Sequence, residues 1–244
     1  MINKALFEGN ISKSNISKLL TALASVNVEV DLPREQFPSY DAKGSIFDIV
    51  ARLIEFRDSL TGGHLFRSQK NIKIFVEKLI ETGVYKEEIS TWDISNVVMS
   101  SQLHDVGKLA IDEAILNKPA KLTPQEYNII KAHTLLGVQI LEIIEKQTQK
   151  PGAMHHAKIF AGAHHERWDG NGYPFGLRGE NIPLEGRIMA IIDVYDALLS
   201  ERPYKRPFPA QEAEQIILNE SGTFFDPTLV EVFCTLSKDF LNLA

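Results

Sequence analysis

Histidine and aspartate side chains that could bind metal ions are concentrated in the middle of this chain. All seven histidines lie between His64 and His165, and five of them are spaced with acidic residues in a way that core packing does not require. Imidazole and carboxylate together suit transition metals of intermediate softness. The seven candidate ligands exceed the four of a closed structural zinc site, so we expect two metals with open coordination positions, as in a hydrolase. The candidates are His64, His104, Asp105, His133, His164, His165 and Asp193.

Taken singly, several of these residues have ordinary structural explanations. His133, on an expected helix, could be a surface or core residue, and His64 follows two glycines and could belong to a helix cap. Asp193 lies in an apolar run, where an unpaired carboxylate would be costly to bury. A metal would remove that cost, and so would a nearby arginine. The prediction of a metal site therefore depends on the set as a whole.

Two motifs resemble those of a known family. His104-Asp105-Val106-Gly107-Lys108 precedes a second run from His164 to Pro174, which reads His-His-Glu-Arg-Trp-Asp-Gly-Asn-Gly-Tyr-Pro. Together they resemble the HD-GYP family, a bacterial branch of the HD phosphohydrolases, and the match extends from about Arg57 to about Phe233. The resemblance implies an all-helical HD domain, a centre of two or three metals, and hydrolysis of cyclic di-GMP.

The resemblance also assigns the ligands to two metals, with Asp105 as the bridge. Neighbouring positions of a helix point about 100° apart, so His104 and Asp105 can share a site only at the edge of a helix. A carboxylate can bridge two metals about 3.5–4 Å apart, whereas an imidazole cannot. A site without thiolates suits two iron or manganese ions, with zinc, nickel or magnesium as alternatives. The predicted sets are His64, His104 and Asp193 for one metal, and His133, His164 and His165 for the other.

The substrate contacts are predicted from cationic residues near these motifs. Two metals that flank a water lower its pKa and hold a bridging hydroxide in line with a phosphodiester, so no serine or cysteine nucleophile is needed. Lys108, three residues after Asp105, is expected to meet the phosphate and to serve catalysis. The family match favours phosphate binding by Arg202 and Lys205 over a solvated turn. Asp196 is expected to contact a guanine or to orient one of the cations.

The loop that contains Gly172-Tyr173-Pro174 has three interpretations. Tyr173, with Trp168 and Phe175, could form a wall or lid over the bases, since bases stack on aromatic faces. In the family, the motif is also associated with docking of GGDEF-domain proteins, which make cyclic di-GMP. The simplest interpretation, which we favour, is a packed loop that braces His164 and His165.

Three functions are compatible with these residues. The leading prediction is a metal-dependent phosphodiesterase that opens cyclic di-GMP to pGpG, with further hydrolysis to GMP left open. The alternatives are a non-hydrolytic module that binds a cyclic dinucleotide or a GGDEF partner, and an HD phosphohydrolase that acts on another nucleotide. The chain retains all seven ligand positions, which favours an enzyme. Both guanine and adenine dinucleotides are compatible with these residues.

One position departs from the family pattern. Family members with a third metal site have a glutamate four residues before the first histidine, whereas this chain has Leu60 before His64. Leucine offers no lone pair. We therefore expect two metals for each chain, with His64 serving only one of them, and hydrolysis that can stall at pGpG.

The bulk composition limits the partners. The net charge of −6 gives no broad basic surface for long nucleic acid, although a small dianionic nucleotide needs only a few local cations. The single cysteine, Cys234, excludes an internal disulfide and fits a reducing compartment. No segment reaches the ~18–20 apolar residues of a membrane span. We expect a soluble, cytoplasmic protein.

The ligands must be positioned by helices, because the apolar residues recur with a helical period. Residues 45–244 are predicted to form an HD-GYP domain, an all-α bundle of about seven or eight helices. The helices are expected near 45–59, 64–81, 92–105, 123–150, 153–165, 184–201, 209–220 and 227–241. Thr123 and Glu126, on either side of Pro124, predict a capped start of the fourth helix. Residues 1–44 are predicted to be an arm with a short helix and an extended linker. A regulatory or dimerising arm, and so a homodimer, is an alternative to the packing extension that we favour. His155 and His156 are predicted to lie on solvated helix surface.

Overall fold

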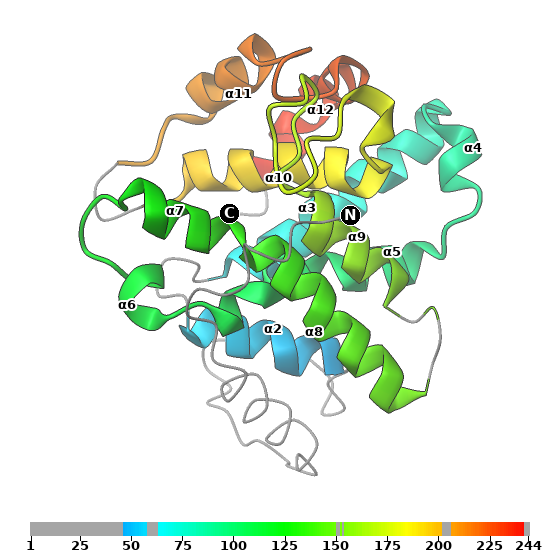
Figure 1. The fold of residues 1–244 in the computed structure, drawn as a ribbon. Helices are drawn as coiled ribbons and strands as arrows, with labels where there is room; N and C mark the ends of the chain where they lie inside the picture. Colours follow the sequence, from blue (N-terminus) through cyan, green and yellow to red (C-terminus); the bar gives the residue numbers. More distant parts are fainter. Residues whose placement is uncertain (1–45, 58–62, 150–151, 153, 202–205, 242–244) are drawn as a thin grey trace, which may run out of the picture.

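The computed structural model describes residues 46–57, 63–149, 152, 154–201 and 206–241. The predicted N-terminal arm, Leu60, Arg202 and Lys205 lie outside these residues. Within these residues the regular secondary structure is helical, and the only bridge of β type is an isolated pair, Ser221 and Phe225. The predicted all-α fold is confirmed (Figure 1).

Most of the helices are joined by short connections, and a longer connection spans residues 164–183. The longer helices lie close to their predicted positions, and the short helices α4 and α6 were not predicted. In chain order the helices are α2 (Ile46–Arg57), α3 (His64–Thr82), α4 (Lys86–Ile89), α5 (Ile94–Ser100), α6 (Glu113–Leu116), α7 (Pro124–Lys131), α8 (His133–Thr148), α9 (His155–Ala163), α10 (Leu184–Leu199), α11 (Ala210–Asn219) and α12 (Pro227–Leu241), with short 3-10 helices at Ser101–Leu103, Val106–Ala110 and Gly179–Asn181.

The predicted helix over 123–150 is two helices. Its start is confirmed: Thr123 accepts a hydrogen bond from the backbone of Glu126 at 3.2 Å, and the Glu126 carboxylate accepts one from the backbone of Thr123 at 2.7 Å. The helix ends at Lys131, however, and a new helix starts at His133. The break leaves His133 at the first position of α8, a terminus that helical periodicity cannot reveal.

Two apolar clusters hold the bundle together. One cluster joins α3, α10 and α12 and contains Phe75, Tyr195 and Phe233. The other joins α2, α8 and α9 and contains Ile54 and Ile140. Helix α9 packs against both α8 and α10, so it connects the two halves of the bundle (Figure 1). The histidines predicted as ligands come from elements of both halves.

The prediction for His155 and His156 is right for one residue and wrong for the other. His155 is exposed, as expected. His156 is buried, and its Nδ1 lies 2.8 Å from Oε1 of Glu185 on α10. The acidic partner is 29 residues away in sequence, which is why no acidic neighbour was visible.

Candidate metal centre

The breaks between helices position most of the predicted ligands. His64 is the first residue of α3 and His133 is the first residue of α8. His104 and Asp105 separate two 3-10 helices, and His164 directly follows α9. The main chain turns at each of these points, so side chains from distant segments can face one centre. His165 follows His164, and Asp193 lies within α10.

The structure brings the predicted ligands together as two adjacent groups. In each group the potential ligand atoms lie within 4.8 Å of one another. Nε2 of His64 lies 3.3 Å from Nε2 of His104, and Nε2 of His133 lies 3.3 Å from Nε2 of His164. Nε2 of His64 also lies 3.4 Å from Oδ1 of Asp193. The groups are His64, His104 and Asp105, and His133, His164 and His165.

Asp105 lies between the two groups and directs one oxygen toward each. Its Oδ2 lies 3.4 Å from Nε2 of His104. Its Oδ1 lies 3.4 Å from Nε2 of His133 and 3.8 Å from Nε2 of His164. A carboxylate in this position has the geometry needed to bridge two metals.

The imidazoles are oriented by hydrogen bonds at the opposite ring nitrogen. Nδ1 of His104 donates to the carbonyl of Ser101 at 2.9 Å, and Nδ1 of His164 donates to the carbonyl of Phe160 at 2.8 Å. His133 donates in the same way to the carbonyl of Ile130 at 2.6 Å. These partners assign the ring hydrogen to Nδ1 and leave the lone pair on Nε2, the arrangement found in metal-binding histidines.

This tautomer makes the centre suitable for cations. Nδ1 of His64 lies 2.7 Å from Oδ2 of Asp196, so His64 also directs a lone pair at Nε2. Two lone pairs that face each other at the 3.3 Å between His64 and His104 repel each other unless a proton or a metal lies between them. The donor set, imidazole nitrogens around shared carboxylates, therefore fits two divalent metal ions.

Burial and neighbouring charges favour the ligand forms of His164, His165 and Asp105. Burial lowers the pKa of His164 well below its usual value and the pKa of His165 to about 3, so both stay neutral near pH 7. Burial opposes the ionisation of Asp105, but Lys108 and His104 outweigh it and hold the pKa of Asp105 well below its usual range. Asp105 is therefore a carboxylate. Burial also opposes the protonation of His104, but Asp105 raises the pKa of His104 overall.

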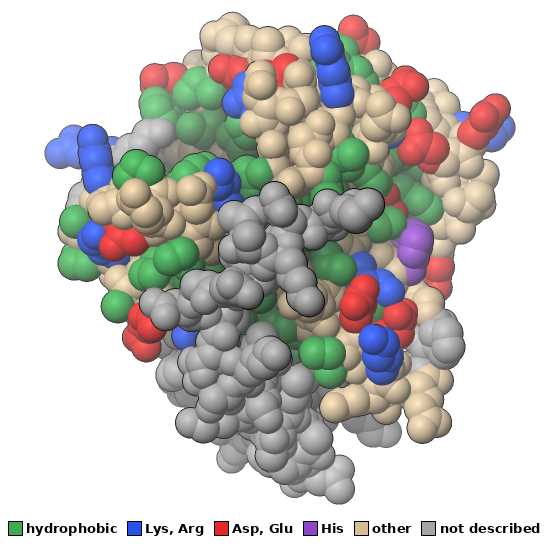
Figure 2. All heavy atoms as spheres, viewed as in Figure 1, with side chains coloured by type: hydrophobic (Ala, Val, Ile, Leu, Met, Phe, Trp, Pro, Cys, Tyr) green, Lys and Arg blue, Asp and Glu red, His purple; other side chains and the backbone are tan. Residues whose placement is uncertain are grey.

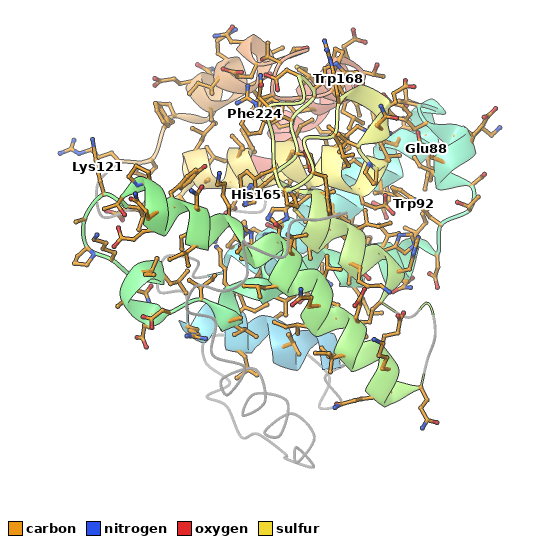
Figure 3. The ribbon with its side chains drawn as sticks, in the orientation of Figure 1. Glu88, Trp92, Lys121, His165, Trp168 and Phe224 are labelled. Atoms are coloured by element: carbon orange, nitrogen blue, oxygen red, sulfur yellow. The ribbon has the colours of Figure 1, made fainter. Side chains whose placement is uncertain are left out.

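Two of the predicted substrate-binding residues lie at the centre. Nζ of Lys108 is 2.8 Å from Oδ2 of Asp105, so its charge is held beside the proposed bridge. The ring of Tyr173 stacks on the ring of His165, with centroids 4.8 Å apart and an interplanar angle of 27°. Tyr173 thus forms a wall beside one ligand, whereas Trp168 lies away from His165 and near Phe224 (Figure 3).

Two residues near Tyr173 were not identified from the sequence. Nζ of Lys131 lies 5.7 Å from the centre of the Tyr173 ring and 5.3 Å from the centre of the Tyr127 ring. Lys131 forms no ion pair with a carboxylate of the described residues, and Tyr127 is 49% exposed. A cation and an aromatic face therefore continue the wall that begins at Tyr173. The only sequence signal was their position on the helix that precedes His133.

The loop after His165 is fixed by a buried carboxylate. Glu166 is 1% exposed and accepts hydrogen bonds from the backbone of Phe175 at 2.7 Å and of Leu177 at 3.0 Å. The backbone of Tyr173 donates to the carbonyl of His165 at 3.1 Å. At Gly172, a Cβ would lie 2.3 Å from the backbone nitrogen of Arg167, so only glycine allows this approach. These contacts support the interpretation that the loop braces the histidine pair.

Asp196, predicted to contact a guanine or to orient a cation, makes its observed contacts inside the protein. It is buried, its Oδ2 accepts from His64, and Arg67 donates to Oδ1 from Nε at 2.6 Å and to Oδ2 from Nη2 at 3.0 Å. Burial opposes its ionisation, but the hydrogen bonds of His64 and Arg67 lower the pKa of Asp196 to about 2. Both oxygens are therefore engaged inside the protein. This favours a role behind His64 over the predicted contact with a guanine.

The face of the molecule drawn in Figure 2 is mixed in charge. On the face drawn in Figure 2, acidic and basic side chains of the described residues are interspersed, and those residues form no broad basic area there. Among the described helices, none combines the length and apolarity that crossing a bilayer would require.

Comparisons with known proteins agree with this architecture. A family model described as HD domain matches residues 48–229. The chain belongs to the HD-domain family. Its relatives and its two motifs support the predicted HD-GYP branch.

Several curated relatives have related names. The chain is 43% identical over 196 residues to a "Probable cyclic di-GMP phosphodiesterase" of Vibrio cholerae, covering 80% of this chain and 44% of the relative. It is 38% identical over 210 residues to a "Cyclic di-GMP phosphodiesterase" of Thermotoga maritima, covering 86% of this chain and 54% of the relative. It is 38% identical over 220 residues to "3'3'-cGAMP-specific phosphodiesterase 2" of Vibrio cholerae, covering 90% of this chain and 38% of the relative. The chain thus spans about half the length of these relatives, or less.

A solved structure shares the fold. The crystal structure of a cyclic GMP-AMP specific phosphodiesterase of V. cholerae superposes with a TM-score of 0.53 at 20% identity, covering 81% of this chain and 50% of that chain. The likeness extends to the helical arrangement and supports the assignment of the fold.

Proposed function

We propose that this protein is a metal-dependent phosphodiesterase that hydrolyses cyclic di-GMP to pGpG. The observation that carries the proposal is the position of Asp105, whose two oxygens face two groups of histidines. The names of the relatives supply the substrate class. Neither argument alone would identify the reaction, because a bridged metal pair is compatible with many hydrolyses.

Two divalent cations bound here would lower the pKa of a water and neutralise charge on the phosphate during attack. The two groups of histidines, with Asp105 and Asp193, would hold these ions. We propose iron or manganese, because the set contains imidazole and carboxylate and no thiolate. We propose two metals and a reaction that ends at pGpG, because Leu60 offers no ligand for a third.

The cationic residues would bind the phosphates of the substrate. Lys108 would orient Asp105 and contact the scissile phosphate, since its ammonium lies at the centre. Phosphate binding by Arg202 and Lys205 is a proposal that rests on the sequence alone. Docking of a GGDEF-domain protein on the loop of Gly172-Tyr173-Pro174 is likewise a proposal, from the family resemblance. A homodimer is a proposal from the arm predicted at residues 1–44.

Turnover and metal content should be measured on the same anaerobically purified protein. We expect about two metal equivalents for each chain and conversion of cyclic di-GMP to pGpG without release of GMP. Removal of the metals by a chelator should stop turnover, and addition of manganese or iron should restore it. Tight binding of cyclic di-GMP by the two-metal protein without turnover would instead support a non-hydrolytic binding module.

A second candidate substrate is 3'3'-cGAMP. It is favoured by the 38% identity to a phosphodiesterase named for that dinucleotide, which extends over 90% of this chain. The two substrates differ in one base and share both phosphates. A comparison of kcat/KM for the two dinucleotides under identical metal conditions would rank them.

Lys131→Ala is expected to raise the KM for the dinucleotide with metal content unchanged. Lys131 lies between Tyr127 and Tyr173 and is not a proposed metal ligand. A charge-assisted contact with phosphate contributes about 1.5–3 kcal/mol, so KM should rise by about ten- to a hundredfold. Lys121→Ala is the matched control, because Lys121 is exposed at the edge of the molecule (Figure 3). Equal kinetics for both variants would show that Lys131 contributes only to the helix surface.

A further inference from the structure

His64 is held in a different way from the other oriented histidines of the centre. His104, His133 and His164 donate from Nδ1 to backbone carbonyls, which are neutral. Nδ1 of His64 instead faces a carboxylate oxygen of Asp196 at 2.7 Å. A carboxylate behind an imidazole fixes the orientation of the ring and increases its strength as a metal ligand.

Arg67 holds that carboxylate in place. Its guanidinium contacts both oxygens of Asp196, at 2.6 Å and 3.0 Å, and also reaches Oγ of Ser200 at 3.2 Å. Two parallel hydrogen bonds from one arginine constrain a carboxylate in both position and rotation. Hydrogen bonds therefore link Arg67 to Asp196 and Asp196 to His64, whose Nε2 faces the centre.

The local backbone leaves room for this arrangement. Gly63 has φ of +71°, a left-handed conformation that glycine adopts most readily, and it directly precedes α3. A Cβ at this position would lie only 3.0 Å from Nη1 of Arg67. Gly63 thus allows the left-handed backbone at the start of α3 and leaves room for the guanidinium of Arg67.

The hydrogen bonds that link Arg67, Asp196 and His64 reach only one of the two proposed metal positions. The first position would combine His64, backed by Asp196, with His104, Asp193 and Asp105. The second would combine three imidazoles that no carboxylate backs among the described residues, together with the other oxygen of Asp105. The first position is thus richer in negative charge.

We propose that Arg67 and Asp196 are positioning residues that control the occupancy of the first metal position and leave the second largely unaffected. The proposal rests on the two-metal centre of the proposed function. It predicts that the two positions can be emptied separately by changes that touch neither a ligand nor the substrate.

The test is a titration of the metal-free wild type and variants with manganese, in which calorimetry measures the affinity of each binding event. Loss of such an outer partner typically lowers metal affinity about ten- to a hundredfold, so Asp196→Asn should weaken one of the two binding events by that factor. Arg67→Gln should weaken the same event, and Arg67→Lys, which keeps the charge without the paired donors, should weaken it less. Circular dichroism and the thermal midpoint of each metal-free protein would check that the fold is retained.

Lys70→Gln is the matched control, because it removes a cation from the same helix, where Lys70 lies over the ring of Phe66 at 4.4 Å. It should bind both manganese ions like the wild type. Equal weakening of both binding events in Asp196→Asn, or of neither, would overturn the proposal. Hydrolysis by the wild type tests the proposed function separately, since the manganese titration gives its answer whether or not a dinucleotide is cleaved.

Discussion

The double variant His104→Ala, Asp105→Ala is expected to lose hydrolysis of the cyclic dinucleotide by more than about a thousandfold and to retain little metal. His104 would supply a terminal ligand, and Asp105 faces both groups of histidines. Loss of an outer partner alone costs about ten- to a hundredfold in metal affinity or activity, so loss of a ligand and of the bridge should cost more. The measurements are turnover at saturating dinucleotide and metal content by elemental analysis.

Asp105→Asn separates the charge of the bridge from its size. An amide has one carbonyl oxygen and a positive edge, so it cannot hold two cations as a carboxylate does. We expect this variant to fold like the wild type and to be nearly as inactive as the double variant. His155→Ala is the control, because it removes an exposed imidazole that lies outside the centre. Full turnover with two metals in the double variant would contradict the two-metal centre.

The local order of the fold could be predicted because it depends on short-range rules. The period of the apolar residues placed α3, α10, α11 and α12 close to their observed positions. The pair Thr123 and Glu126 predicted the start of α7, since a capping box satisfies two free backbone donors over three residues. The interruption before His133 was not predicted, because no glycine or proline marks it.

The candidate ligands were predicted by residue type, but their partners were not. The acceptors behind His104, His133 and His164 are backbone carbonyls, which every residue carries, so no sequence pattern can point to them. The pairs His156 with Glu185 and Asp196 with Arg67 join helices distant in sequence. Only the packing of α3 and α9 against α10 brings these charges together.

Gly107→Ala is expected to destabilise the fold and to disrupt the metal centre at the same time. A Cβ at Gly107 would lie 1.8 Å from the carbonyl oxygen of His133 and 2.6 Å from the backbone nitrogen of Gly137. Extra methylene groups in a packed interior cost about 1–3 kcal/mol, and occasionally more. Here the obstacle is backbone, which cannot rotate away, so we expect a loss of at least about 3 kcal/mol.

The backbone shift that Gly107→Ala requires should also move Asp105, the proposed bridge. Gly107 is two residues from Asp105, and its obstacle is the residue that carries the His133 imidazole. Movement of the 3-10 helix Val106–Ala110 away from α8 would lengthen the 3.4 Å separation between Asp105 and His133. The thermal midpoint should fall by about 6–12 °C for such a loss, and metal content should fall below two equivalents.

Gly162→Ala is the control for this prediction. Its Cβ would lie 3.2 Å from a methyl group of Val138, a side chain that can shift by a few tenths of an ångström. The substitution lies on α9, which packs on the same helix α8, so it adds one methyl group to a comparable interface. We expect a change within about 1 kcal/mol, because a small overlap with a side chain can relax. If both variants kept the wild-type midpoint and metal content, close contact between Gly107 and the start of α8 would not be needed to hold Asp105 against His133.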